Sequence, residues 1–275
     1  MRWLRNLFSR TAPAATPVVA PSPTEPAPAA VAGWDSWRAT SPEGPVGVAL
    51  DLALEGRVPD AARPRLLRLS YPLRAPGPDG QPTAAESEAL ARVEDALSAA
   101  LAAIGASYAG RVTLAGVRQH LFYLAAGAAA AEARGVAAPG LTGYELSAHG
   151  EDDPAWKAWG AELSPPPRAR RWMEDRREVE ALVRLGVKLE APRPVDHQAS
   201  FPTGAARVDF ELDAAALGFS PAARRDDAPP PAPFAVDLRR ADSITLRHIH
   251  GVAWSLCELA TRHGGGYDGW EPASD

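Results

Sequence analysis

The C-terminal end of the chain constrains its fold most, because an amphipathic stretch there is followed by a glycine hinge and one short apolar segment. Apolar residues at helical spacing follow Ser243, which we expect to cap a helix, and they continue to about Arg262. Gly264–Gly266 then break the helix, and Tyr267–Trp270 read as a strand. A helix that passes through a glycine hinge into one short strand is typical of the end of a small α/β module. We therefore expect the chain to end in such a domain.

The segments before this helix alternate between helix and strand patterns. A first helix is expected from about Met173 to Leu185, with Val179, Leu182 and Val183 facing inward. The expected strands are His197–Phe201, Ala222–Arg225, Phe234–Arg239 and Tyr267–Trp270. The two helices between them are expected to bury Val208, Leu212, Ala215 and Ala216 in one case, and Ile249, Val252, Leu256 and Leu259 in the other. The order βαββαβ is that of a ferredoxin-like sandwich, so we predict this fold for the C-terminal domain.

A second domain of mixed helices and strands is predicted upstream, which makes the chain α+β with two α/β sandwich domains. Its expected strands are Val46–Leu54, Leu66–Leu73, Tyr108–Val117 and Gln119–Ala125. Thr83 and Glu86 have the spacing of a capping box, in which each side chain satisfies a free backbone amide. The helix that follows has its apolar residues at Leu90, Val93, Leu97, Leu101 and Ile104. Trp156 and Trp159 are expected on a short helix opened by Asp153.

Proline-rich segments divide the chain into three parts. Residues 11–32 are almost entirely Ala, Pro, Ser, Thr and Val and include six prolines, so we expect an extended spacer without a core. Ser164–Pro167 mark the boundary between the two folded domains. The predicted parts are therefore a tail of residues 1–32, an N-terminal domain of residues 33–167 and a C-terminal domain of residues 168–275.

The first ten residues carry an amphipathic pattern. The apolar side chains Trp3, Leu4, Leu7 and Phe8 fall on one helical face. The basic and polar side chains lie mostly on the opposite face. They lack the continuous apolar core of a signal peptide. One interpretation is a weak membrane-surface anchor or a docking helix for a partner. The other is a disordered tail with a chance pattern.

Composition excludes some classes of function. The net charge of −5 gives no electrostatic basis for direct nucleic-acid binding. The single cysteine, Cys257, cannot form an internal disulfide, which fits a reducing cytoplasm. No stretch of the sequence reaches the roughly eighteen apolar residues of a membrane span. We therefore predict a cytoplasmic protein.

The sequence shows no catalytic, metal or cofactor constellation. On a helix, His248 and His250 would project about 160° apart, so they cannot chelate one ion. No base is spaced to lie beside a nucleophile with a third group to orient it. We predict that the protein is not an enzyme and binds no metal or cofactor.

Three segments near the C-terminus have a family resemblance. Phe201–Thr203 precede a helix that ends at Leu217–Phe219, and Tyr267–Trp270 close the domain. With the segment from about Arg177, they resemble the bacterial regulator of ribonuclease activity B, a protein inhibitor of ribonuclease E. The resemblance implies a non-enzymatic regulator that binds this ribonuclease and affects RNA turnover. The family's strongly acidic C-terminal tail is missing and a long N-terminal domain is added, so the partner can differ here.

The N-terminal domain has a resemblance of its own. Gly110–Thr113, the run Arg118–Tyr123 and the helix start Asp153–Trp156 resemble an uncharacterised bacterial domain family that often precedes regulator-like domains. That family implies no known activity.

A partner-binding face is predicted around Trp254, Tyr267, Asp268 and Trp270. On the final helix Trp254 points about 140° away from Ile249, and an exposed Trp is a favoured interface anchor. The alternative is structural: Trp254 would be a half-buried flank residue, while Tyr267 and Trp270 pack across strands.

Three functions follow from these observations. The leading hypothesis is a regulator that inhibits a ribonuclease E-type enzyme by protein–protein binding. The second is a membrane-surface interaction adaptor that uses residues 1–10. The third is an undetected enzyme in the N-terminal domain, with a pocket that gathers Arg118, His120 and Tyr123 from one strand.

Overall fold

The computed structural model describes residues 33–137 and 143–273. The chain divides into two compact units, one up to Ala169 and one from Arg170, and each is described by itself. The predictions made for residues 1–32, including the amphipathic start, lie outside the described residues.

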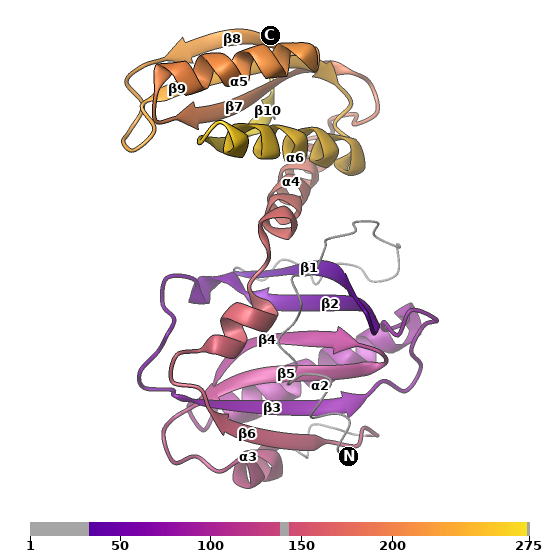
Figure 1. Cartoon of the computed structure of the whole chain (residues 1–275). Helices are drawn as coiled ribbons and strands as arrows, with labels where there is room; N and C mark the ends of the chain where they lie inside the picture. Colours follow the sequence, from indigo (N-terminus) through magenta and orange to yellow (C-terminus); the bar gives the residue numbers. More distant parts are fainter. Residues whose placement is uncertain (1–32, 138–142, 274–275) are drawn as a thin grey trace. The chain divides into compact units, whose positions relative to one another are not determined.

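The N-terminal unit is built on a six-stranded antiparallel sheet with the strand order β1-β2-β4-β5-β3-β6 (Figure 1). The strands are β1 (Trp34–Ser41), β2 (Gly44–Asp51), β3 (Arg65–Pro72), β4 (Ser107–Leu114), β5 (Val117–Leu124) and β6 (Ser147–Asp152). The helices are α2 (Ala84–Ala102) and α3 (Ala130–Ala137), with the short turns η1 (Leu52–Leu54) and η3 (Trp159–Leu163). The main core lies between α2 and the sheet and includes Leu67, Leu69, Leu90, Leu97, Leu101 and Phe122.

A short helical turn packs against β2 and β4. Leu163 of η3 lies against Gly110, where an added Cβ would come within 2.5 Å of the Ala49 carbonyl oxygen. Only glycine allows so close an approach of the two strands and the turn.

Two strands of this unit were not predicted, and two were predicted too long, since β4 ends at Leu114 rather than Val117. β1 and β6 were missed. β2 ends at Asp51 rather than Leu54, because the Asp51 carboxylate accepts a hydrogen bond from the Ala53 amide at 2.9 Å and turns the chain into η1. An aspartate that bonds the backbone two residues ahead favours a turn over a continued strand.

The predicted capping box was wrong, although α2 does begin after Thr83. The Glu86 carboxylate accepts hydrogen bonds from the amides of Arg74 and Ala75, at 2.7 and 2.9 Å. The Thr83 hydroxyl donates to the Ala75 carbonyl at 3.1 Å instead of accepting from the helix. Both side chains therefore tie the incoming loop to the helix rather than cap each other.

The C-terminal unit is a ferredoxin-like sandwich, as predicted. Its elements are α4 (Pro167–Arg184), β7 (Arg193–Phe201), α5 (Gly204–Ala216), β8 (Ser220–Arg225), β9 (Phe234–Asp242), α6 (Leu246–Arg262) and β10 (Gly266–Pro272). The strands pair antiparallel in the order β10-β7-β9-β8, which places the first and third strands of the βαββαβ unit in the centre. Both α5 and α6 pack on one face of this sheet (Figure 1).

The inward face of α6 was predicted correctly. Ile249, Leu256 and Leu259 are buried and Val252 packs partly against them. The start of α6 was predicted wrongly, because Thr245 rather than Ser243 occupies the N-cap position.

The inward face of α5 was predicted wrongly. Val208 is 48% exposed and Leu212 is 66% exposed, while Ala215 and Ala216 are exposed as well. The buried residues are Arg207, Phe210, Glu211 and Ala214. In α4 the prediction held for Val179 and Leu182 but failed for Val183, which is 53% exposed.

Candidate functional site

The four residues predicted to contact a partner differ in their accessibility. Asp268 on β10 is exposed, and Trp254 on α6 is half-buried. Tyr267 packs partly into the core, and Trp270 is buried with 7% of its surface exposed. The accessible part of the predicted face is therefore Trp254 and Asp268.

A β-bulge explains why two aromatic residues of β10 face the same way. Residues three apart in a regular strand point to opposite faces, yet Tyr267 and Trp270 both pack on the helical side of the sheet. The register of β10 against β7 shifts between Tyr267 and Gly269, and Gly269 has a φ of +149°. The extra residue turns Trp270 inward, which glycine at this position makes possible.

Trp270 binds a buried carboxylate on α4. Its Nε1 donates a hydrogen bond to Asp175 Oδ1 at 2.8 Å, and Arg171 Nε donates to the same oxygen at 2.9 Å. His250 Nδ1 lies 2.9 Å from Asp175 Oδ2. Asp175 is completely buried, so these three partners replace the water that a free carboxylate would bind. We call Asp175, Arg171, His250 and Trp270 the Asp175 cluster; it joins α4 to α6 and β10.

Sequence reasoning did not find Asp175. A lone aspartate in a charged helix normally faces solvent, and the neighbours Glu174 and Arg176 gave no sign that this one is buried. Its spacing of four residues from Arg171 was the available signal, since such a pair shares one helix face.

A histidine and a tyrosine lie in the core beside this cluster. His197 Nδ1 is 2.8 Å from the Tyr267 hydroxyl, and His197 is only 1% exposed. Burial lowers the pKa of His197 to about 4, so its ring is neutral at pH 7. Burial also raises the pKa of Tyr267 well above its ordinary value. Both groups are neutral and enclosed, which suits packing rather than proton transfer to a substrate.

The pocket considered in the N-terminal domain does not form. Arg118 and His120 face α2, whereas Tyr123 points to the other face of the sheet and donates to Asp153 Oδ2 at 2.8 Å. His120 is completely buried between the hydroxyls of Tyr71 and Tyr108, at 3.0 and 2.8 Å. Burial lowers the pKa of His120 to about 3. The expected gathering of these three side chains was wrong, because alternate residues of a strand face opposite sides.

His248 and His250, which were predicted to point apart, bind two different partners. His248 Nε2 lies 2.7 Å from Asp242 Oδ1, while His250 belongs to the Asp175 cluster. Among residues 33–137 and 143–273, no three His, Cys, Asp or Glu side chains are grouped closely enough to hold a metal ion. In the same residues no helix is both long and apolar enough to cross a membrane.

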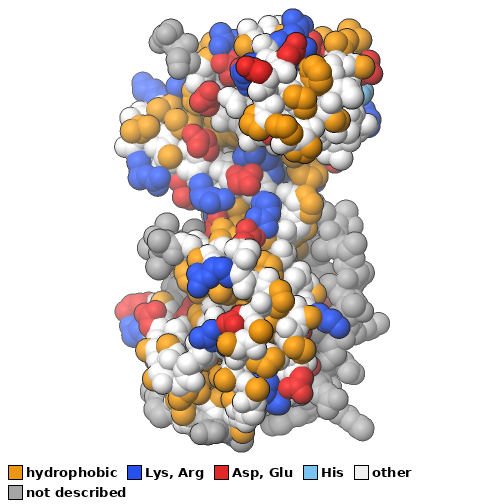
Figure 2. Space-filling model, turned by 90° about the vertical axis from the view of Figure 1, so that its left-hand side faces the viewer, with side chains coloured by type: hydrophobic (Ala, Val, Ile, Leu, Met, Phe, Trp, Pro, Cys, Tyr) orange, Lys and Arg blue, Asp and Glu red, His pale blue; other side chains and the backbone are white. Residues whose placement is uncertain are grey.

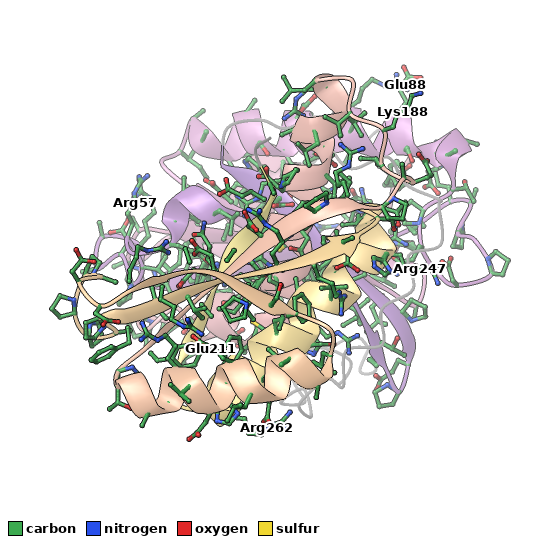
Figure 3. All side chains as sticks on the ribbon, turned by 90° about the horizontal axis from the view of Figure 1, so that it is seen from above. Arg57, Glu88, Lys188, Glu211, Arg247 and Arg262 are labelled. Atoms are coloured by element: carbon green, nitrogen blue, oxygen red, sulfur yellow. The ribbon has the colours of Figure 1, made fainter. Side chains whose placement is uncertain are left out.

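The outer face of α5 is the accessible apolar surface that sequence reasoning missed. Val208 and Leu212 lie on it, and Leu217 follows at the end of the helix with 48% of its surface exposed. On the inner side, Glu211 lies between the helix and the strands and accepts from Arg224 of β8 at 2.6 Å (Figure 3). Arg207 donates to the carbonyls of Arg225 and Ala235 at 3.1 and 3.3 Å.

Comparisons with known families separate the two units. Residues 172–271 match the family model described as "Regulator of ribonuclease activity B", which confirms the resemblance seen in the sequence. Residues 32–162 match a "Family of unknown function (DUF695)", which confirms the second resemblance. The first match extends from α4 to β10 and supports a regulator of ribonuclease activity in general.

Comparisons with individual proteins add little. A search of the curated proteins found no match. Among solved structures, the chain is similar to a crystal structure of an unknown protein from Galdieria sulphuraria, with 13% identity and a TM-score of 0.22. That similarity covers 77% of this chain and 99% of the other, and its TM-score is too low to support a conclusion about the fold.

Proposed function

We propose that the protein is a non-enzymatic, cytoplasmic regulator that binds a ribonuclease E-type endoribonuclease and slows its cleavage of RNA. The observation that carries this proposal is the family match over residues 172–271, which covers nearly all of the C-terminal unit. The enzyme's identity comes from the sequence resemblance, and the single cysteine fits the cytoplasm.

The open face of the C-terminal sheet supports a protein partner over RNA. Ferredoxin-like domains that bind single-stranded RNA stack bases on aromatic side chains of this face. Here the described residues of the face carry no aromatic ring and are joined by ion pairs. Arg239 binds Asp196 through two hydrogen bonds of 2.6 Å, and Arg225 binds Asp237 at 2.7 and 2.8 Å. These arginines are neutralised locally and offer little to a phosphate backbone.

In this proposal Trp254 and Asp268 contribute to the contact, while Tyr267 and Trp270 hold β10 in place behind it. The measurement is calorimetric binding of the full chain to purified ribonuclease E, together with the rate of RNA cleavage. We expect a dissociation constant in the micromolar range or tighter, and slower cleavage at saturation. Trp254→Ala should weaken binding.

Failure to bind ribonuclease E in low salt would reject the proposed function. Binding that is unchanged in both Trp254→Ala and Asp268→Ala would keep the function and reject this contact. The weak membrane-surface contact predicted for residues 1–10 is a separate prediction, and unchanged membrane fractionation after deletion of residues 1–32 would reject it.

A further inference from the structure

The outer side of α5 carries an apolar surface, which we call the α5 stripe: Val208, Leu212, Ala215 and Ala216. Every member is exposed. At about 100° per residue, these four residues lie within roughly 100° of one another around the helix. Figure 2 shows apolar side chains on the surface of the C-terminal unit, with acidic side chains close beside them. Contiguous apolar surfaces with a polar border mark sites of interaction in soluble proteins.

The inner side of α5 buries charged residues, although apolar residues are available on the outer side. The helix buries Arg207 and Glu211, only 9% and 8% exposed, on the side that faces the sheet. Phe210 fixes this orientation, because its ring packs on Phe201 with 4.8 Å between the ring centroids. The helix therefore buries the charged residues Arg207 and Glu211 next to Phe210, and it leaves Val208 and Leu212 exposed to solvent.

The charges beside the stripe select the kind of partner. Asp209 and Asp213 are four residues apart and form an acidic row along one border of the stripe. Both are exposed, and Asp213 Oδ2 lies 3.0 Å from His263 Nε2. An acidic row repels nucleic-acid phosphates and anionic lipid headgroups, and attracts lysine and arginine side chains.

A second copy of the chain fits this surface poorly. When two α5 helices pair antiparallel through their stripes, the same border of each helix meets its counterpart, as equivalent flanks do in antiparallel helix pairs. Asp209 and Asp213 would then lie against the same residues of the other copy, and like charges in contact oppose association.

We propose that the α5 stripe is the docking surface for an amphipathic helix of a protein partner that places Lys or Arg beside its apolar face. Leu212 and Val208 would pack among apolar residues spaced three and four apart, and Asp209 and Asp213 would pair with the basic residues. Resting on the proposed function, we assign this helix to the ribonuclease.

The test compares two pairs of exposed residues of the same types in the full chain. Val208→Ser with Leu212→Ser removes the stripe, and Val183→Ser with Leu185→Ser removes an exposed valine and leucine elsewhere, at 53% and 79% exposure. We expect the stripe variant to bind ribonuclease E at least about tenfold more weakly, whereas the control pair changes affinity less than about twofold. Asp209→Lys with Asp213→Lys should weaken binding most at low salt, since screening removes the charge contribution.

A second probe separates failure of the surface from failure of the proposed function. A synthetic helix of about eighteen Leu and Lys residues with leucines on one face carries the required chemistry without the ribonuclease. Binding of this peptide by the wild type and its loss in the stripe variant support the surface even when ribonuclease E does not bind. Ribonuclease E binding that the stripe variant keeps at full strength overturns the proposal and leaves the proposed function standing.

Other occupants would also overturn the proposal. Concentration-dependent dimers that disappear in the stripe variant would assign the stripe to a second copy. Peptide binding that appears only after deletion of residues 1–32 would assign it to the chain's own N-terminal segment. Binding to anionic vesicles that is lost in the stripe variant would assign it to a lipid surface.

Discussion

The helices α5 and α6 cover the same sheet, but they divide their apolar residues in opposite ways. α6 buries Ile249, Leu256 and Leu259 and exposes the polar side chains of Ser255 and Glu258. α5 buries Phe210 with a charged pair and exposes Val208 and Leu212. Hydrophobic periodicity predicts the inward face of α6 because most of the side chains that this helix buries are apolar. On α5 the apolar contact with the core is made by Phe210 and Ala214. Burial in the core therefore does not explain the apolar residues on the outer face of this helix.

The largest expected effect tests the core side of this comparison. Leu256→Ala on α6 removes a fully buried side chain and should lower the free energy of unfolding of the C-terminal unit by about 3 kcal/mol or more. The loss is measured by urea unfolding of the full chain, with hydrogen exchange of peptides within residues 193–272 as the readout. A loss below about 1 kcal/mol would mean that α6 does not carry the core as described.

Acid should weaken the core that both helices share. His197 lies at a ring-centroid distance of 5.4 Å from Phe219, next to the end of α5, and bonds Tyr267, which follows α6. Its pKa is about 4 in the folded protein against about 6.5 unfolded, so between these values the unfolded chain binds more protons. The stabilisation is present above pH 6.5 and is lost as the pH falls toward 4. We expect a loss of about 2 kcal/mol between pH 7 and pH 5.

The same exchange experiment at pH 7 and pH 5 checks this expectation. His197→Gln is the control, because glutamine can still bond the Tyr267 hydroxyl but does not titrate in this range. An equal acid loss in this variant would assign the effect to other groups.

A smaller effect is expected from the charged pair under α5. Glu211→Gln keeps the shape of the side chain but removes the charge that faces Arg207, at 3.7 Å, and Arg224, at 2.6 Å. We expect a loss of about 1–2 kcal/mol, because Arg207 would stay buried with fewer partners. Thermal unfolding would reveal it. A gain in stability would show that the pair is retained for a reason other than stability.

The smallest effect should come from the stripe itself. Leu212→Ala removes a side chain that is 66% exposed and should change stability by less than about 0.5 kcal/mol in either direction. This variant, measured beside Leu256→Ala in the same urea titration, makes the comparison quantitative. Equal losses would mean that the outer face of α5 is covered within the chain.

Much of the C-terminal fold could be predicted from the sequence. Strands such as Phe234–Arg239 and the hinge at Gly264–Gly266 gave the βαββαβ order, because turns and apolar runs are local signals. The missed strand β1 has polar or charged residues at Asp35, Ser36 and Arg38, so its pairing with β2 rather than its own pattern makes it a strand.

The site was harder to predict than the fold. The inward turn of Trp270 depends on a bulge at Gly269, and a single inserted residue reverses every side chain after it. The face of α5 depends on the contact between Phe210 and Phe201, which are on different elements. Periodicity compares the two faces of a helix only by their apolar content, and by that measure Val208 and Leu212 outweigh Arg207 and Glu211.

The Asp175 cluster has a practical consequence for anyone who cuts this chain into fragments. All four strands of the ferredoxin-like unit lie after Asp175, so a fragment that begins at β7 includes every strand of the sheet. Such a fragment would leave Trp270 Nε1 and His250 Nδ1 without their carboxylate. The family match begins at residue 172, inside α4. A cut that preserves the unit must therefore fall before Arg171, and α4 is a part of the domain it leads into.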